Sequence, residues 1–409
     1  MINFGRKKNS LYLCNLIISH TSFSMKILWL SSWFGDYRVP VYDNLNRLSD
    51  GAFWIVCSEM ETSELVRRKL REKLGDHAII MPQQKIIRLG NADSDFANSS
   101  LALHWQQGLY SAIRNVKPDV IIVEGFGRWA PAGIIYSILH RKRLLMFYER
   151  TAWTERKAGW WRTLYRRLAG KAVDCFLSNG ALSEQYLREN LGFSSAPIIR
   201  GCMSADSFYL HHDVEAELEA RHKADRETEC RNGKGIRFLY VGRIVERKGI
   251  RQLLEAWEIH HQSYSNDTLT LAGEGILLNE MRERYGDDKG IIMAGYVSYD
   301  RIYSYYKECD VVVQPTLEDN WSLVIPEAMS CGRAVMCSIY NGGYPELVKD
   351  SVNGYSFDPL DKEGFVNAFA KFHSAKLLKM GRQGMMIEKN FSPEKAALRI
   401  YKACLRKVK

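Results

Sequence analysis

Several familiar signatures are missing from this chain of 409 residues. No apolar run approaches the roughly 20 residues that a membrane-spanning helix needs. The nine cysteines include no Cys-x-x-Cys pair, so the usual spacing of a zinc site is absent. An odd and scattered set of cysteines favours reduced, mostly buried thiols in a cytoplasmic protein.

Acidic residues are in deficit, but only in one half of the chain. Residues 1–200 contain 28 Lys and Arg against 17 Asp and Glu, whereas residues 201–409 contain 29 against 30. The formal net charge of +10 therefore comes from the first half. This imbalance favours a phosphate-rich partner, namely a nucleic acid, an anionic membrane or an acidic substrate. The composition, 46% hydrophobic and 25% charged, excludes a disordered, collagen-like or coiled-coil chain.

Residues 1–24 differ from the rest of the chain. A basic triplet at 6–8 and an apolar run at 11–18 imitate a signal peptide, but Asn15 interrupts the run and no good cleavage site comes after it. Because a strand-like segment opens at Met25, we expect a tail or an over-extended start of the chain. A tail that contacts a membrane weakly and a secretion signal are the alternatives.

Short apolar segments alternate with helical patterns from residue 25 onward. In the first half we expect strands at 27–30, 53–57, 120–123, 144–148, 175–178 and 198–199. Apolar residues at helical spacing predict helices at 42–48, 101–115 and 132–140. Strand and helix in alternation indicate a parallel sheet that is flanked by helices.

The alternation pauses at the highly charged stretch 213–235, which offers little to a core, and then restarts. Beyond it we expect strands at 237–241, 269–272, 291–294, 310–314 and 334–338 and helices at 251–260, 277–285 and 325–331. The sequence thus predicts an α/β protein of two doubly wound, Rossmann-like domains that face each other across a cleft. Ligands bind such sheets at the carboxyl ends of the strands.

The predicted divisions of the chain come from this pattern. They are a tail 1–24, a first domain 25–210, a linker 211–235, a second domain 236–390, and a last helix in 391–409 that packs back on the first domain.

Cationic side chains follow the strand predicted at 237–241. Gly242 permits a tight turn there, and Arg243 and Lys248 share the loop that leads into the next helix. Two cations beside a helix N-terminus suit a diphosphate. The alternative is a solvated basic loop. Gly273 opens a further glycine-rich turn, which is too short to be a dinucleotide-binding fingerprint.

Two acidic residues follow the strand predicted at 310–314. Asp319 and Glu327 are eight positions apart, and Pro326 marks the start of a helix. An acid in the loop and an acid in the first helical turn can face one cleft. A carboxylate in that place can accept hydrogen bonds from two sugar hydroxyls, and the helix dipole there favours its ionised form.

This order of motifs resembles the retaining, nucleotide-sugar-dependent glycosyltransferases of family 4, which have the GT-B fold. The resemblance is strongest over residues 236–360 and extends more weakly over 25–210, where the Arg38-Val39-Pro40-Val41-Tyr42 segment is similar to a family motif. It implies a UDP- or GDP-sugar as co-substrate, with no cofactor and no metal ion. Asp93-Ser94-Asp95 spells D-x-D, a metal motif of another glycosyltransferase fold, but it lacks an apolar strand before it.

The resemblance implies roles for the residues that match the family's motifs. Arg243 and Lys248 would bind the donor diphosphate, and Glu327 would hold the nucleotide ribose. Asp319, where the family usually has Glu, would contact the donor sugar near the reacting carbon, or the preceding Glu318 would take its place.

The resemblance also assigns the turns around the donor. Gly242 and Gly273 would line the donor site, and Tyr296 would lie in the nucleobase loop. The backbone amides of the segment after Asp319 would meet the sugar hydroxyls: Asn320, Trp321, Ser322 and Leu323.

In the first domain, the resemblance implies that the loop 31–38 touches the donor phosphates. Gly35 would permit close backbone approach there, although the family's double glycine is missing. Many members place a histidine after the strand that corresponds to 144–148, where this chain has Glu149. Glu149 is then either a base on the acceptor side or an ordinary ion-pair partner.

The segment 150–171 concentrates tryptophan and basic residues, among them Trp153, Trp160, Trp161, Arg162, Arg167 and Lys171. Such a helix can lie in a membrane interface, with its aromatic rings among the headgroups and its cations toward anionic lipid. The alternative is a domain helix whose tryptophans lie in the core.

We therefore expect a glycosyltransferase that moves a hexosyl unit to a glycan or a lipid-linked acceptor in surface polysaccharide or glycolipid synthesis. Its expected place is the cytoplasm, peripheral on the inner face of the membrane. A non-catalytic sugar-binding protein, a phosphorylase or epimerase of the same fold, and a nucleic-acid-binding protein are the alternatives. Since no nucleic-acid-binding motif is present, we assign the positive charge to a membrane and a phosphate-linked acceptor.

Overall fold

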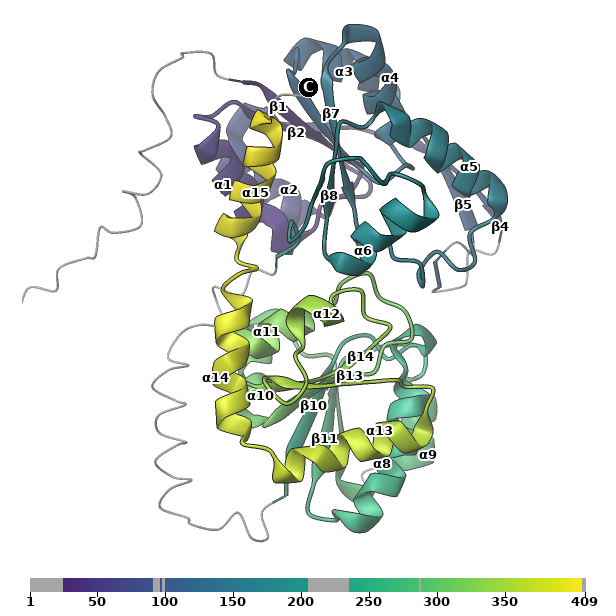
Figure 1. The fold of residues 1–409 in the computed structure, drawn as a ribbon, viewed down its shortest axis with the longest axis vertical. Coiled ribbons are helices and arrows are strands. Elements are labelled where there is room, and N and C mark those ends of the chain that lie inside the picture. The colour runs from purple at the N-terminus through teal and green to yellow at the C-terminus, as the bar shows by residue number, and fades with distance from the viewer. Residues whose placement is uncertain (1–24, 91–95, 98–99, 205–234, 287, 407–409) are drawn as a thin grey trace, which may run out of the picture.

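The computed structural model of this chain describes residues 25–90, 96–97, 100–204, 235–286 and 288–406. The predicted tail 1–24, the Asp93-Ser94-Asp95 triplet and nearly all of the predicted linker 211–235 lie outside the described residues. The described part forms two α/β domains, one above the other in Figure 1. The expected pair of doubly wound domains is thereby confirmed. Among the described helices, none combines the length and apolar character that crossing a bilayer requires.

The first domain is built on a seven-stranded parallel sheet. In spatial order its strands are β3 (Ala78–Met81), β2 (Phe53–Ser58), β1 (Ile27–Leu30), β6 (Val120–Glu124), β7 (Arg143–Tyr148), β8 (Cys175–Ser178) and β9 (Ile198–Ile199). Its helices include α1 (Val39–Leu48), α2 (Glu64–Leu74), α3 (Leu109–Val116), α4 (Ala130–His140), α5 (Trp160–Ala169) and α6 (Ala181–Gln185).

Strand β1 shows why this sheet is read so easily from the sequence. Ile27 and Trp29 belong to the core beneath α1 and α2, whereas Leu28 and Leu30 belong to the core beneath α3 and α4. Successive side chains of a strand point to opposite faces, and here both faces are covered by helices. A strand in that position is apolar throughout, which makes it a continuous hydrophobic run.

The second domain repeats the plan with six parallel strands. In spatial order they are β12 (Ile291–Gly295), β11 (Thr268–Ala272), β10 (Arg237–Val241), β13 (Val311–Gln314), β14 (Ala334–Ser338) and β15 (Gly354–Phe357). Its helices include α8 (Ile250–Ser263), α9 (Leu278–Tyr285), α10 (Tyr299–Glu308), α11 (Val324–Ser330), α12 (Tyr344–Leu347), α13 (Lys362–Ala370) and α14 (Leu377–Glu388).

The helix predicted at 101–115 is wrong in its first part. Residues Ser100–Trp105 form strand β5, which pairs antiparallel with β4 (Lys85–Gly90), and α3 begins only at Leu109. Leu101, Leu103 and Trp105 recur every second residue, the period of a strand. Pairing with the preceding strand β4 determines the conformation of this segment, and its helical spacing does not.

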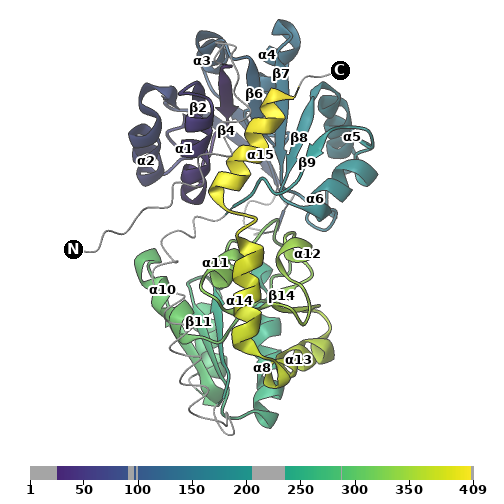
Figure 2. The same ribbon diagram turned by 60° about the vertical axis from the view of Figure 1, so that its left-hand side comes forward.

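The last helix joins the two domains. α14 lies on the second domain, and α15 (Pro393–Leu405) packs on α1 of the first (Figures 1 and 2). Ser392 caps α15 by accepting a hydrogen bond from the Lys395 amide, and Pro393 occupies its first turn. The apolar face of α15, including Ile400, is buried in the core that contains β1. The chain thus crosses back to the domain in which it started.

Ile400 tests the contribution of this crossing to stability. Because its side chain is fully buried against the first domain, Ile400→Ala should lower the free energy of unfolding of that domain by about 2–5 kcal/mol. Denaturant unfolding followed by tryptophan fluorescence measures the change. The exposed neighbour Lys402, changed to Ala, should shift it by less than about 0.5 kcal/mol. Equal effects of the two substitutions would show that α15 is not part of the core.

Candidate active site

Each sheet contains one point where the order of the strands reverses. In the second sheet this point lies between β10 and β13, and in the first between β1 and β6. Loops that leave the carboxyl ends of such neighbouring strands diverge and leave room for a ligand. The loop of Gly242 and Arg243 follows β10, and the loop of Asp319 follows β13. The residues predicted to hold the donor therefore meet at the switch point of the second sheet.

Two glycines allow the loops at this edge to approach closely. Gly242 and Gly273 have φ values of +147° and +157°, in a region that other residues rarely adopt. A Cβ atom on Gly273 would lie 1.8 Å from the carbonyl oxygen of Gly242, so no larger residue fits. The turn after β11 is thus packed directly against the turn after β10.

The two predicted diphosphate-binding cations differ in their surroundings. The Arg243 side chain is exposed in the loop after β10, and the Tyr240 hydroxyl donates a hydrogen bond to the Arg243 carbonyl oxygen at 2.7 Å. Lys248 ends a short 3-10 helix (Glu246–Lys248), and its Nζ lies 2.5 Å from Oδ2 of Asp319. The structure therefore joins Lys248 and Asp319 in an ion pair.

Asp319 is held by both of its carboxylate oxygens. Oδ2 receives Lys248, and Oδ1 accepts a hydrogen bond from the Trp321 amide at 3.3 Å. Burial alone would raise the pKa of Asp319, but the Lys248 ammonium, Arg247 and the Trp321 amide together outweigh burial, so the pKa lies below the ordinary value. Asp319 is thus an ionised carboxylate near neutral pH, and a donor phosphate would compete with it for Lys248.

Glu327 is positioned by a residue that the sequence did not single out. It lies in the first turn of α11, and its Oε2 accepts a hydrogen bond from the hydroxyl of Tyr306 at 2.9 Å. Tyr306 comes from α10 and is fully buried, so it holds the carboxylate from the core side. The contact fixes one oxygen of the carboxylate, while the role of Glu327 toward a nucleotide ribose stays a prediction.

Two backbone amides of the loop between these acids already donate hydrogen bonds to other residues of the protein. The Trp321 amide donates to Asp319, and the Ser322 amide donates to Oδ1 of Asn341 at 3.2 Å. Both Asn320 and Leu323 lie in the same segment, directly before α11. Tyr296 follows β12 at the same edge of the sheet and its side chain is exposed, as a residue offered to a nucleobase would be.

The first domain contributes a buried cluster of charges. Arg38 is only 3% exposed and donates to Oε1 of Glu124 at 2.8 Å and to Glu149. Burial raises the pKa of Glu124, with Arg38 acting in the opposite direction. The structure therefore gives Glu149 an ion-pair partner, while its role as a base stays a prediction. Glu124 was missed, although its place at the end of β6 was a usable signal.

The loop of Gly35 turns toward the second domain. A Cβ atom on Gly35 would lie 2.5 Å from the ring of Tyr37, so the glycine makes room for that ring. Tyr37 packs against the core of the second domain, and burial raises its pKa to about 12. Tyr37 thus lies between Arg38 and the core of the second domain. It belongs to the predicted loop 31–38, although the sequence did not single out its side chain.

A different cluster lies at the start of β10. Nε2 of His260 and Nε2 of His373 lie 2.8 and 2.9 Å from Oδ2 of Asp267. Three potential metal-ligating atoms thus meet within 4.8 Å. Both separations are those of hydrogen bonds, and Oδ1 of Asp267 accepts the Ile236 amide at 2.7 Å. We assign this cluster a structural role, in which Asp267 holds the start of β10 in place, and no role in the reaction.

Comparison with known proteins adds a family to this geometry. Residues 222–389 match the family described as Glycosyl transferases group 1. The matched segment is less than half of the chain and corresponds to the second domain. The segment that resembles this family includes the switch point and the four predicted donor residues, Arg243, Lys248, Asp319 and Glu327.

Curated relatives match only part of this chain. A lipopolysaccharide 1,2-N-acetylglucosaminetransferase of Salmonella typhimurium is 31% identical over 142 residues, 32% of this chain and 37% of that protein. An Escherichia coli UDP-Gal:alpha-D-GlcNAc-diphosphoundecaprenol alpha-1,3-galactosyltransferase is 28% identical over 174 residues, 41% and 44% of the two chains. The matched segment thus spans less than half of these relatives.

Solved structures share the fold over nearly the whole chain. Anabaena HepE in complex with UDP has a TM-score of 0.67 at 15% identity and covers 93% of this chain and 99% of its own. Sucrose-phosphate synthase from Thermosynechococcus elongatus has a TM-score of 0.63 at 15% identity, with 93% and 98% covered. The two domains of this chain therefore form a GT-B fold, as the motifs predicted.

The Lys248–Asp319 pair makes a prediction about stability and pH. Lys248→Gln leaves a partly buried carboxylate without its cation, so we expect the free energy of unfolding at pH 7 to fall by about 1–3 kcal/mol. The folded-state pKa of Asp319 is lowered, so the pair stabilises the fold above the unfolded-state pKa of about 3.9. That contribution is lost as the pH falls through the folded-state pKa.

Denaturant unfolding at pH 7 and at pH 3 tests this prediction. The difference between the native chain and K248Q should shrink at the lower pH. Lys142→Gln breaks an exposed pair with Asp119 and is the matched control, with little effect at either pH. A K248Q difference that is the same at both pH values would contradict the assignment.

Proposed function

We propose that this chain is a metal-independent, retaining hexosyltransferase that uses a UDP- or GDP-sugar as donor. The observation that carries the proposal is that Arg243, Lys248, Asp319 and Glu327 all follow the two strands of the switch point, within the segment that matches group 1. Two cations suit a diphosphate, and two carboxylates suit the hydroxyls of a ribose and a hexose. UDP complexes among the structural neighbours, such as that of HepE, support a nucleotide donor.

The proposed chemistry uses these residues without a resident metal. The acceptor hydroxyl attacks the anomeric carbon from the face on which the diphosphate leaves. The carbon–phosphate oxygen bond breaks as the new glycosidic bond forms, and the hydroxyl proton passes to the leaving diphosphate. Arg243 and Lys248 stabilise the charge that develops on that group. Lys248 first exchanges Asp319 for phosphate, which frees the carboxylate for the donor sugar.

The acceptor that fits best is a lipid-linked glycan in surface polysaccharide or glycolipid synthesis. Two observations support it. The Escherichia coli relative is named for an undecaprenol diphosphate acceptor, and the Salmonella relative is a lipopolysaccharide transferase. The positive charge of the chain lies in the domain that would receive the acceptor.

Arg243 tests the donor assignment. After a thermal-shift screen of nucleotide sugars, release of free nucleotide measures turnover with the sugar that binds. Arg243→Ala should reduce turnover by roughly 10²–10³, because one charge that stabilises the leaving diphosphate is lost. Arg301→Ala, an exposed cation on α10, is the control. The assay is run in chelator, and near-normal transfer by R243A would rule the assignment out.

The surface of the first domain supports peripheral attachment to an anionic membrane. No residue of α5 is buried, and its Trp160 and Leu168 are 78% and 58% exposed. The interpretation that Trp160 and Trp161 fill a core is therefore wrong. Leu139 of α4, which packs near the end of α5, is 66% exposed. We call the exposed apolar residues of these two helices the α4–α5 face: Ile135, Ile138, Leu139, Trp160, Trp161, Leu164, Tyr165 and Leu168.

Cations accompany this face, which is why we propose a bilayer as its occupant rather than another protein. Arg141, Arg167 and Lys171 are exposed on the same helices or at their ends. Aromatic rings and cations together suit the headgroup layer of an anionic membrane. The enzyme would then work on the cytoplasmic side, bound to the inner face of the membrane.

Sedimentation with vesicles tests the membrane proposal. The chain should bind vesicles that contain phosphatidylglycerol at low salt and much less at high salt. The double variant W160A/L168A should bind more weakly, because it loses apolar area that would enter the interface. Ile276→Ala removes an equally exposed apolar side chain from the second domain and should bind normally. Absence of binding at both salt concentrations would end the proposal.

A further inference from the structure

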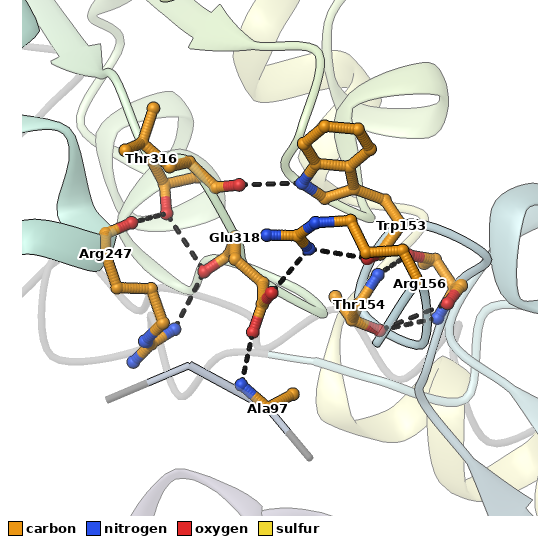
Figure 3. A network of polar contacts seen from close by, with 9 residues as sticks. Ala97, Trp153, Thr154, Arg156, Arg247, Thr316 and Glu318 are labelled. Atoms are coloured by element: carbon orange, nitrogen blue, oxygen red, sulfur yellow. Dashed lines mark hydrogen bonds and ion pairs between the residues drawn. The ribbon is translucent and has the colours of Figure 1, made fainter. Parts of the chain in front are cut away.

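Glu318 adjoins Asp319 in sequence but serves the other domain. It is only 3% exposed. Oε1 accepts a hydrogen bond from the Ala97 amide at 2.7 Å, and Oε2 lies 2.5 Å from Nη1 of Arg156 (Figure 3). Ala97 and Arg156 both belong to the first domain. Glu318 is therefore engaged across the domain boundary, whereas Asp319 pairs with Lys248. Which of the two acids contacts the donor sugar stays a prediction.

The backbone beside Glu318 is held from both sides as well. From the first domain, Nε1 of Trp153 donates to the carbonyl oxygen of Leu317 at 2.7 Å. From the second domain, Nη1 of Arg247 and the Thr316 hydroxyl donate to the carbonyl oxygen of Glu318 at 2.8 and 3.1 Å (Figure 3). Residues 316–318 are thus clamped between the two domains immediately before Asp319.

Ring contacts continue the clamp to Asp319 itself. Trp153 stacks on Tyr340 of the second domain at a centroid distance of 4.1 Å, and the Arg156 guanidinium lies over the Trp153 ring at 4.3 Å from its centroid. The carbonyl oxygen of Tyr340 accepts the Asp319 amide at 3.2 Å. The first domain therefore contacts Glu318, which precedes Asp319 in the chain, and Tyr340, which accepts a hydrogen bond from the Asp319 amide.

We propose that Arg156 and Trp153 are positioning residues, which give the donor loop 316–322 its binding geometry only when the two domains are closed. The physical reason is the cost of a buried charge. If the domains separate, Glu318 loses Arg156 and the Ala97 amide and must find water instead, and the loop loses its anchors. Closure and loop geometry are then a single event, so the donor sugar is aligned only when the acceptor domain is in place.

This inference rests on the proposed function, and kinetics test it. Arg156→Ala should lower kcat about tenfold or more through misalignment of the donor sugar. The Kd of UDP should stay within about twofold, because R156A leaves Arg243, Lys248 and Glu327 in place. Arg156→Lys, which keeps the charge but not the fork of donors, should recover part of kcat. Arg114→Ala, which removes an exposed cation from α3, is the control.

A second variant distinguishes a positioning role from a general loss of folding. Trp153→Phe keeps a ring to stack on Tyr340 but cannot donate to Leu317, so it should lower kcat less than R156A does. If R156A and W153F both turn over the donor at the native rate, the positioning role is wrong. If kcat and UDP affinity fall together in both variants, the two residues support the fold in general and the proposal also fails.

Amide hydrogen exchange separates this inference from the proposed function. Should the native chain turn over no nucleotide sugar, the proposed function fails, but the clamp can still be measured. Amides of residues 316–322 should exchange faster in R156A than in the native chain and in R114A. Unchanged exchange in that segment would overturn the clamp whatever the activity.

Discussion

Close approach of backbone at the switch point of the second sheet is the constraint on which the candidate site depends. The turn after β11 can meet the turn after β10 only because Gly273 carries no Cβ atom. The turns after β10 and β11 thus form one side of the candidate site. The loop after β13, which carries Asp319, forms another side. Side chains as distant in sequence as Lys248 and Glu327 come to one edge because parallel strands all end there.

Two cations of the candidate site, Lys248 and Arg38, are already paired with carboxylates of the protein. Lys248 is neutralised by Asp319, and Arg38 is shared by Glu124 and Glu149. A donor diphosphate therefore has to compete with a carboxylate for its cation. That competition disfavours weak anions and makes binding depend on several contacts at once. The released carboxylate becomes available at the place where a sugar hydroxyl would lie.

The two domains are joined by contacts of different kinds. Helix α15 attaches the end of the chain to the first domain by burying apolar side chains, which is strong and insensitive to ligand. The contacts of Glu318 with Arg156 and Ala97 are polar and lie beside the candidate site. Polar contacts can exchange for water when the domains part, so they suit a closure that is made and broken during turnover.

The sequence alone predicted the fold and named the candidate donor residues of the second domain. Continuous apolar strands and glycine turns predict two doubly wound sheets, since strands covered on both faces are apolar throughout. The spacing of Arg243, Lys248, Asp319 and Glu327 depends on local order along the chain, which is why it could be recognised. The helix predicted at 101–115 is wrong in its first part because residues 100–105 pair with the preceding strand β4.

Only the tertiary structure decided which groups meet. Asp319 and Glu318 are equivalent as neighbours in sequence, yet one pairs with Lys248 and the other with Arg156 of the first domain. Tyr306 reaches the site from α10, which carries no motif, and the packing of Tyr37 on the second domain could not be predicted from its loop. Trp160 is exposed while Trp153 inserts between the domains, although both lie in one aromatic and basic segment. Contacts across a domain boundary depend on packing, which leaves no periodic trace in the sequence.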